Sequence, residues 1–138
     1  MFECVILVGV PGAGKSSLYR QRFETTHRRI EDKRRLDAAL AAGVSVVVDN
    51  TNPRRADRAP LIAAARAHGA RVVGYFFEVS TRAAVARNAA RTGKDRVPNV
   101  AIFTVARRLE PPTIDEGFDE LYRVTIADDR SLRIERQA

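Results

Sequence analysis

Apolar residues along the chain fall into short continuous runs, separated by longer segments in which they recur three and four positions apart. The continuous runs cover Glu3–Val8, Val44–Val48 and Arg71–Phe77. Runs that are apolar at nearly every position are typical of parallel strands buried on both faces. Near the end of the chain, residues 122–126 and 131–134 predict a strand and a hairpin around two aspartates. The alternation of strands with helical segments predicts an α/β fold with a parallel sheet.

The helical segments end at residues that commonly stop helices. Gly43 and Gly69 follow two of them, where glycine is favoured because it tolerates positive φ. Asn52 and Pro53 suit a helix cap followed by the first helical position. Pro60 should break or kink the same helix near its start. Helices are expected at residues 15–23, at about 36–42, from about 53 to 68, at 81–91 and at 99–109.

A glycine-rich segment, Gly9 to Ser16, lies between the first apolar run and the first helix and reads G-x-x-x-x-G-K-S. This is the phosphate-binding loop signature in the context it requires, after a buried strand and at a helix start. Gly12 and Gly14 permit backbone angles at which neighbouring N–H groups converge on phosphate oxygens. Lys15 can reach the β- and γ-phosphates, and the Ser16 hydroxyl can ligate Mg²⁺. The residues expected to bind the nucleotide are Gly9, Pro11, Gly12, Ala13, Gly14, Lys15, Ser16 and Ser17.

Two further features place charge near this loop. Asp49 follows the second apolar run, and ligands of parallel sheets bind at the carboxyl ends of the strands. Asp49 is therefore predicted to face Mg²⁺, directly or through water, although a turn or cap role also fits. Arg87 and Arg91 are four residues apart and share one helical face. Two such cations repel each other unless an anion lies between them, so they indicate an anion site or, alternatively, a solvated face.

Composition narrows the class of protein. The 138 residues carry a net charge of +7; of the 24 basic residues three are Lys, which leaves 24 − 3 = 21 Arg. A basic chain favours polyanionic partners such as nucleic acid or nucleotide phosphates. The chain also contains 21 Ala, however, so a general bias toward Ala and Arg explains the charge equally well. The charge alone is weak support for nucleic acid.

The length is sufficient for one domain with a hydrophobic core, expected to span residues 1–138. No apolar run approaches the roughly 20 residues of a membrane-spanning helix. The N-terminus enters a strand directly, so no signal peptide is expected. The lone cysteine, Cys4, lies in an apolar run and fits a core position in a reducing cytoplasm.

Four motifs together resemble the kinase domain of polynucleotide 5′-kinases, within the P-loop kinases. They are G-V-P-G-A-G-K-S-S at 9–17, V-V-V-D-N-T-N-P at 46–53 with Arg58 behind it, R-N-A-A-R-T-G-K at 87–94 with Val97-Pro98, and P-P-T-I-D-E-G-F at 111–118. The D-N-T-N-P segment combined with R-N-x-x-R is far more specific than the phosphate loop alone. The resemblance implies the P-loop NTPase fold, a three-layer α/β/α arrangement with a mostly parallel sheet, and phosphoryl transfer that depends on ATP and Mg²⁺.

The resemblance also implies roles for single residues. Lys15 and Ser16 would hold ATP and the metal, while Arg87 and Arg91 would belong to a lid that closes over the phosphates. An arginine in that position neutralises charge that spreads onto the transferred group. The predicted catalytic residues are Lys15, Arg91 and Asp32; the predicted metal ligands are Ser16 and Asp49; the predicted substrate contacts are Asp49, Asn52 and Arg58. Arg54 and Arg55 are further candidates for the acceptor path.

One departure from the family concerns the general base. The family carries an aspartate soon after the first helix, which accepts the proton of the attacking hydroxyl. Here the segment between Ile30 and Leu36 is shorter than the family's by about two helical turns. Asp32 is the nearest candidate and Glu31 the next. Either the base has moved, or it has been lost, or residues are absent from the chain; a lost base typically costs about 10²–10⁴-fold in rate.

Three hypotheses for the function follow. The first is a kinase that phosphorylates the 5′-hydroxyl of single-stranded or end-exposed nucleic acid. The second is a P-loop kinase of a small molecule, because a fold alone does not choose the acceptor. The third is a nucleotide-binding protein that has lost transferase activity through the short 25–37 segment. The acceptor and the oligomeric state are left open by the sequence.

Overall fold

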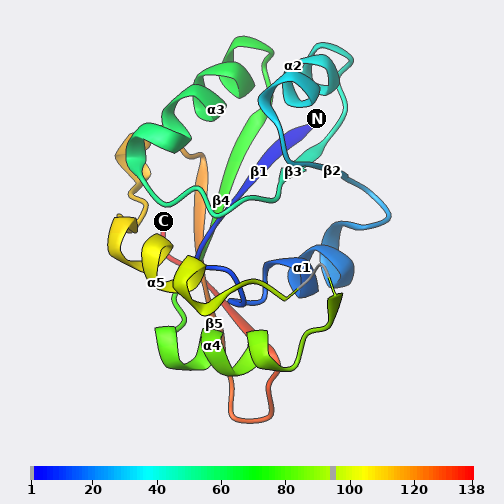
Figure 1. The fold of residues 1–138 in the computed structure, drawn as a ribbon. Helices are drawn as coiled ribbons and strands as arrows, with labels where there is room; N and C mark the ends of the chain where they lie inside the picture. The colour runs from blue at the N-terminus through cyan, green and yellow to red at the C-terminus, as the bar shows by residue number, and fades with distance from the viewer. Residues whose placement is uncertain (1, 94–95) are drawn as a thin grey trace.

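Strands form where the apolar runs predict them and assemble into one sheet. The structure, a computed structural model, describes residues 2–93 and 96–138 (Figure 1). The strands are β1 (Glu3–Val8), β2 (Arg28–Ile30), β3 (Val46–Val48), β4 (Arg71–Phe77), β5 (Glu120–Ile126) and β6 (Leu132–Arg136). Their order is β2-β3-β1-β4-β5-β6. Every neighbouring pair is parallel except β5 and β6, which form the predicted hairpin.

Helices cover both faces of this sheet, which gives three layers (Figure 1). They are α1 (Lys15–Leu18), η1 (Tyr19–Phe23), α2 (Lys33–Ala41), α3 (Arg55–Ala67), α4 (Thr81–Ala89), α5 (Asn99–Arg108) and the short η3 (Ile114–Glu116). Ile6 and Val8 of β1 pack in a core with α2 and α3, whereas Val5 and Leu7 pack with α1, α4 and α5. The three-layer α/β/α prediction with a mostly parallel sheet is confirmed.

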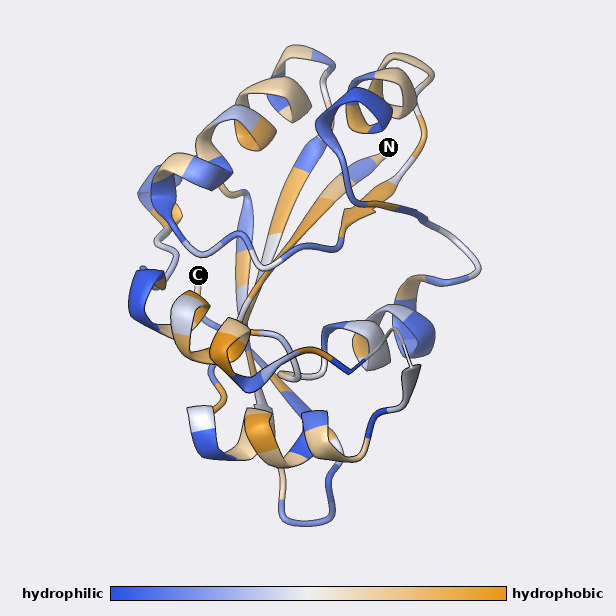
Figure 2. Cartoon of the chain, in the orientation of Figure 1, coloured by the Kyte–Doolittle hydropathy of each residue, from blue (hydrophilic) through white to orange (hydrophobic). Residues whose placement is uncertain are grey.

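Burial on both faces explains the continuous apolar runs. Residues 4–8 of β1 are completely buried although successive side chains point to opposite sides. Figure 2 shows the same pattern, with hydrophobic colour along the central strands and mixed colours on the surrounding helices. Among the described residues, no helix has the length and apolar character needed to cross a membrane.

Most predicted bounds agree with the structure. β1 and β4 begin and end at the predicted residues. The first helix also keeps its bounds, but it winds as an α-helix only to Leu18 and as a π-helix from Tyr19 to Phe23. β3 is shorter than predicted and begins at Val46 instead of Val44. The carboxyl ends of these strands lie where the sequence places them, at the edge of the sheet that holds the phosphate loop.

The edge strand β2 was missed by the sequence pattern. Its residues Arg28 and Arg29 are exposed, and only Ile30 is buried. An edge strand has one neighbour and little apolar surface to bury, so it lacks the apolar run that marks the inner strands. Its pairing with β3, in which Ile30 lies opposite Val48, places the following residues at the carboxyl edge of the sheet.

Of the break or kink predicted at Pro60, the break does not occur. α3 runs without interruption from Arg55 to Ala67. A proline removes the hydrogen bond to the carbonyl four residues earlier, which here belongs to Ala56. Both Pro60 and Ala56 are exposed, so water can bind that carbonyl in place of the missing N–H.

The cap of α3 was also predicted wrongly. The helix begins at Arg55 with Arg54 as its cap, two residues beyond the predicted Asn52 and Pro53. Asn52 has a positive φ of 44°, and its side-chain Nδ2 donates to the carbonyl of Leu7 at 2.7 Å. This side chain therefore joins the segment after β3 to β1 and does not cap the helix.

Candidate functional site

The phosphate loop occupies the turn between β1 and α1. Gly12 and Gly14 have φ angles of 83° and 104°, which only glycine adopts without strain. A Cβ atom at Gly12 would lie 2.6 Å from the carbonyl oxygen of Ala84, so α4 packs directly against the loop. On the other side, the Gly9 N–H donates to the carbonyl of Thr51 at 3.0 Å. The loop is thus held between α4 and the segment that follows β3.

Lys15 lies at the start of α1 and is buried. Its Nζ donates to the carbonyls of Gly9 at 2.6 Å and Val10 at 3.2 Å, so the side chain folds back over the loop. Burial lowers the pKa of Lys15 to about 8; nearby Asp49 opposes this shift and Arg91 adds to it. The ammonium group is therefore positioned at the loop, where a phosphate would favour its charged form.

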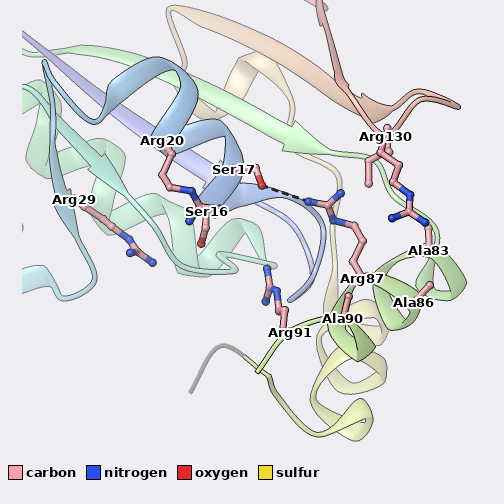
Figure 3. A pocket seen from close by; sticks show the side chains of 11 residues that line it. Ser16, Ser17, Arg20, Arg29, Ala83, Ala86, Arg87, Ala90, Arg91 and Arg130 are labelled. Carbon is pink, nitrogen blue, oxygen red and sulfur yellow. Dashed lines mark hydrogen bonds between the residues drawn. The ribbon is translucent and has the colours of Figure 1, made fainter. Parts of the chain in front are cut away.

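A pocket of about 580 Å³ opens beside the loop (Figure 3). Five of its lining residues are arginines, and none of the described ones is acidic. Such a lining is suited to an anion of high charge. The residues around the pocket are Ser16, Ser17, Arg20, Arg29, Ala83, Ala86, Arg87, Ala90, Arg91, Ile126 and Arg130.

Arg87 projects from α4 toward the phosphate loop. Its Nη2 lies 3.4 Å from the hydroxyl of Ser17, and its buried Nε has no acceptor in the described part of the chain. Burial lowers the pKa of Arg87, and the neighbouring Arg91 and Arg130 lower it further. A buried donor without an acceptor costs free energy, so this guanidinium is suited to receive an anionic oxygen. Arg91 lines the same pocket, but α4 ends at Ala89, so Arg91 lies just beyond the helix and not on its face.

Asp49 lies directly after β3, near Lys15. Its side chain is only 4% exposed and accepts from Arg29 Nε at 2.6 Å. Across residues 2–93 and 96–138, no group of three or more acidic, histidine or cysteine side chains could hold a metal. Mg²⁺ would therefore take water as ligands besides Ser16 or Asp49, and phosphate oxygens in addition once a nucleotide is bound, which is its usual manner of binding next to phosphates. The oxygen donors present fit this ion.

Arg58, predicted to contact the substrate, lies inside the protein. Its side chain is 0% exposed and makes a two-pronged ion pair with Glu116, at 2.8 and 2.9 Å. Its Nη1 donates to the carbonyls of Asn52 and Pro53. With its guanidinium engaged inside the protein, Arg58 holds the segment after β3 in place. Asn52 is also buried, and its side chain is bonded to Leu7. The substrate roles of Arg58 and Asn52 stay predictions.

Asp32 is placed by the structure at the start of α2. Its Oδ1 accepts from the N–H of Arg35 at 2.8 Å, and its Oδ2 lies 3.5 Å from Arg35 Nε. This geometry caps the helix. Neither Asp32 nor Glu31 lines the pocket. The structure therefore does not bring the predicted general base to the phosphate loop.

Three pocket arginines were absent from the sequence prediction. Arg20 is four residues after Ser16, so helical spacing could have identified it. Arg29 lies on the missed strand β2. Arg130 has a positive φ of 68° in the turn between β5 and β6, and only the hairpin's position against α4 brings it to the pocket.

A second, smaller pocket of about 310 Å³ lies between the segment after β3 and α5. Arg54 lines it but is paired with Asp57, whereas Arg55 is paired with Asp115 and lies outside the lining. The lining residues are Asn50, Thr51, Asn52, Pro53, Arg54, Asp57, Val105 and Arg108.

Comparison with known proteins gives a family match and several similar structures. The family model of the AAA domain matches residues 21–112, a range that begins after the phosphate loop. The bifunctional polynucleotide phosphatase/kinase of Schizosaccharomyces pombe is 29% identical over 135 residues, which cover 88% of this chain and 33% of that protein. The chain thus spans about a third of the length of this curated relative.

Two solved structures illustrate the likeness in fold. A gluconokinase from Sinorhizobium meliloti 1021 is 22% identical with a TM-score of 0.63, covering 91% of this chain and 83% of that one. A sugar kinase from Janibacter sp. HTCC2649 is 17% identical with a TM-score of 0.70, covering 91% and 86%. At these identities the likeness establishes the fold and leaves the acceptor open.

Proposed function

The chain belongs to the AAA domain family and has the fold of P-loop kinases, and from this premise we propose that it transfers the γ-phosphoryl group of ATP to a hydroxyl acceptor. The observation that carries the proposal is the pocket beside the phosphate loop, which five arginines line together with no described acidic residue. A transferred phosphoryl group spreads negative charge over its oxygens, and catalysis depends mainly on positioning and on neutralising that charge.

Different residues around the loop bind different parts of the nucleotide and its metal. Backbone N–H groups of Gly12 and of residues 14–17 surround the phosphates, and the glycines leave room for them. Lys15 leaves its carbonyl partners and contacts the β- and γ-phosphates. The Ser16 hydroxyl and Asp49 hold Mg²⁺, which when bound neutralises phosphate charge. Arg87 binds the phosphates through its unsatisfied donor, and Arg91 contacts the transferred group.

In the chemical step, the acceptor oxygen forms a bond to the γ-phosphorus while the bond from that phosphorus to the β,γ-bridging oxygen breaks. ADP leaves with the bridging oxygen's electron pair, and the acceptor proton passes to solvent. No side chain is assigned as the base, because Asp32 caps α2. Without a base the step is slower, typically by about 10²–10⁴-fold, and catalysis then depends on positioning and on charge neutralisation.

For the acceptor, we propose the 5′-hydroxyl of a polynucleotide. The resemblance to a polynucleotide phosphatase/kinase and the net charge of +7 support this choice. The alternative is a small hydroxyl compound, which is favoured by the structural likeness to a gluconokinase and a sugar kinase.

The test uses labelled ATP with a 5′-hydroxyl oligonucleotide, the same oligonucleotide already 5′-phosphorylated, and a set of sugars and sugar acids. We expect label on the 5′-hydroxyl strand only. Lys15→Ala should lose this transfer while remaining folded in the absence of ATP. Label on a sugar would establish the alternative. ATP binding without transfer to any acceptor would leave a nucleotide-binding protein and refute the kinase proposal.

A further inference from the structure

The Asp49 carboxylate is held by a cation in the place where the proposed function puts the metal. The side chain is 4% exposed, and Arg29 Nε lies 2.6 Å from its Oδ2. A nearly buried carboxylate requires a partner, because desolvation without one is costly. In the structure Arg29 supplies that partner.

The side chain of Arg29 can move away from Asp49. Its side chain is 44% exposed, in contrast to that of Asp49. A second carboxylate oxygen, Glu31 Oε1, lies 3.6 Å from its Nη2, and its guanidinium carbon lies 5.9 Å from the centre of the Tyr19 ring. An arginine with a second anion and an aromatic face nearby can give up one partner without becoming isolated.

Arg29 also faces the nucleotide pocket. It extends from β2 into the space that Arg87 and Arg91 enter from the opposite wall (Figure 3). A triphosphate in this pocket would therefore offer the released guanidinium a new anionic partner. Guanidinium and Mg²⁺ compete for the same carboxylate oxygens, and such competition is reciprocal by thermodynamic linkage.

From this geometry, and resting on the proposed function, we infer that Arg29 is a resident counter-ion of Asp49 that Mg²⁺ displaces. Arg29 thereby sets the metal affinity of the site. It keeps the carboxylate neutralised without nucleotide, and it turns to the phosphates when the metal binds.

The chain provides a matched control in Arg28. Both arginines are exposed on β2, but neighbouring residues of a strand point to opposite faces. Arg28 shares its face with the buried Ile30 and does not line the pocket. Arg28→Ala and Arg29→Ala remove the same charge from the same strand, so any general effect of net charge on cation binding cancels between them.

The experiment measures Mn²⁺ binding, as a stand-in for Mg²⁺, by calorimetry without nucleotide. We expect Arg29→Ala to bind Mn²⁺ about tenfold or more tightly than the wild type, the order expected for removing one charge-assisted hydrogen bond. Arg28→Ala should match the wild type. Arg29→Gln, which keeps a hydrogen-bond donor without the charge, should also bind more tightly and guards against a fold defect in the alanine variant. In an Asp49→Asn background the Arg29→Ala gain should disappear.

Equal Mn²⁺ affinity in Arg28→Ala and Arg29→Ala would overturn the inference. So would a gain that persists without the Asp49 carboxylate, or the absence of Mn²⁺ binding in all of these proteins. Because metal binding is measured without an acceptor, a failure of phosphoryl transfer would refute the proposed function and leave this result unaffected.

Discussion

Arg58, which contacts the segment that follows β3, differs in its surroundings from the five arginines of the pocket beside the phosphate loop. Arg58 is completely buried, and each of its donor groups is matched by Glu116 or by a backbone carbonyl. The arginines around the phosphate loop face a common pocket that has no described acidic lining residue. Arg87 among them even retains a buried Nε without an acceptor in the described chain.

The difference shows how one residue type serves the fold in one place and a ligand in another. A cation that is permanently buried must be neutralised inside the protein, because leaving water costs several kcal/mol. A cation that binds a ligand needs donors that the ligand can reach. Its repulsion from neighbouring cations is relieved when the anion binds. The lowered pKa of Arg87, caused by burial and then by Arg91 and Arg130, is a sign of that unsatisfied state.

The largest effect is expected from breaking the Arg58 pair. Arg58→Ala leaves the Glu116 carboxylate buried without its cation and the Asn52 and Pro53 carbonyls without a donor. We expect the free energy of unfolding to fall by about 3–5 kcal/mol, measured by urea denaturation. Arg54→Ala, which removes an arginine from the more exposed pair with Asp57, should cost less than about 1 kcal/mol.

A double substitution sharpens this prediction. Replacing Arg58 by Met and Glu116 by Leu removes both charges, so part of the lost stability should return. The recovery should be incomplete, because the two carbonyls remain without their donor. Full recovery would mean that the carbonyl contacts contribute nothing.

The opposite pattern is expected for Arg91. Arg91→Ala should leave the free energy of unfolding within about 0.5 kcal/mol and lower kcat by roughly 10²–10³-fold, the usual cost of losing one transition-state donor. Affinity for ATP should change less than kcat, which single-turnover measurements would separate. Arg82→Ala on α4 is the control, since this exposed arginine does not line the pocket. Equal rates for the two variants would show that Arg91 is a surface residue.

The smallest predicted effect is the pH dependence of ATP binding. Lys15 has a pKa of about 8 because burial lowers it, and only the charged form attracts phosphate. ATP affinity should therefore be highest below pH 8. It should fall about tenfold between pH 7 and pH 9, because the charged fraction of Lys15 falls by about that factor across this range. Lys15→Arg, which stays protonated, should remove this dependence in equilibrium binding measurements.

The same pKa determines the sign of a stability effect. The pKa of Lys15 is lower in the folded than in the unfolded protein, so the folded state binds fewer protons between pH 8 and 10.5. The burial cost of the charged Lys15 is fully present below pH 8 and is relieved as the pH rises through this interval. Unfolding curves of the wild type and Lys15→Met should therefore converge toward alkaline pH.

Prediction from the sequence succeeded where residues near one another in the chain carry the information. The bounds of β1 and β4, the hairpin at β5 and β6, and the phosphate loop all follow from local apolar runs and glycine positions. It failed at β2 and at the cap role of Asn52, where exposure to water or a distant partner decides the outcome. It also did not identify the ion pair of Arg58, because sequence does not reveal that Glu116 lies beside it.

The order of residues was thus enough to specify an α/β sheet and a loop whose backbone suits phosphate, because apolar periodicity and glycine conformation act over a few positions. Packing alone decided which arginine is buried in an ion pair and which arginines face the pocket. Arg29, Arg87 and Arg130 come from a strand, a helix and a hairpin turn far apart in the chain. Only the assembled sheet, which aligns the carboxyl ends of its strands at one edge, brings their charges together.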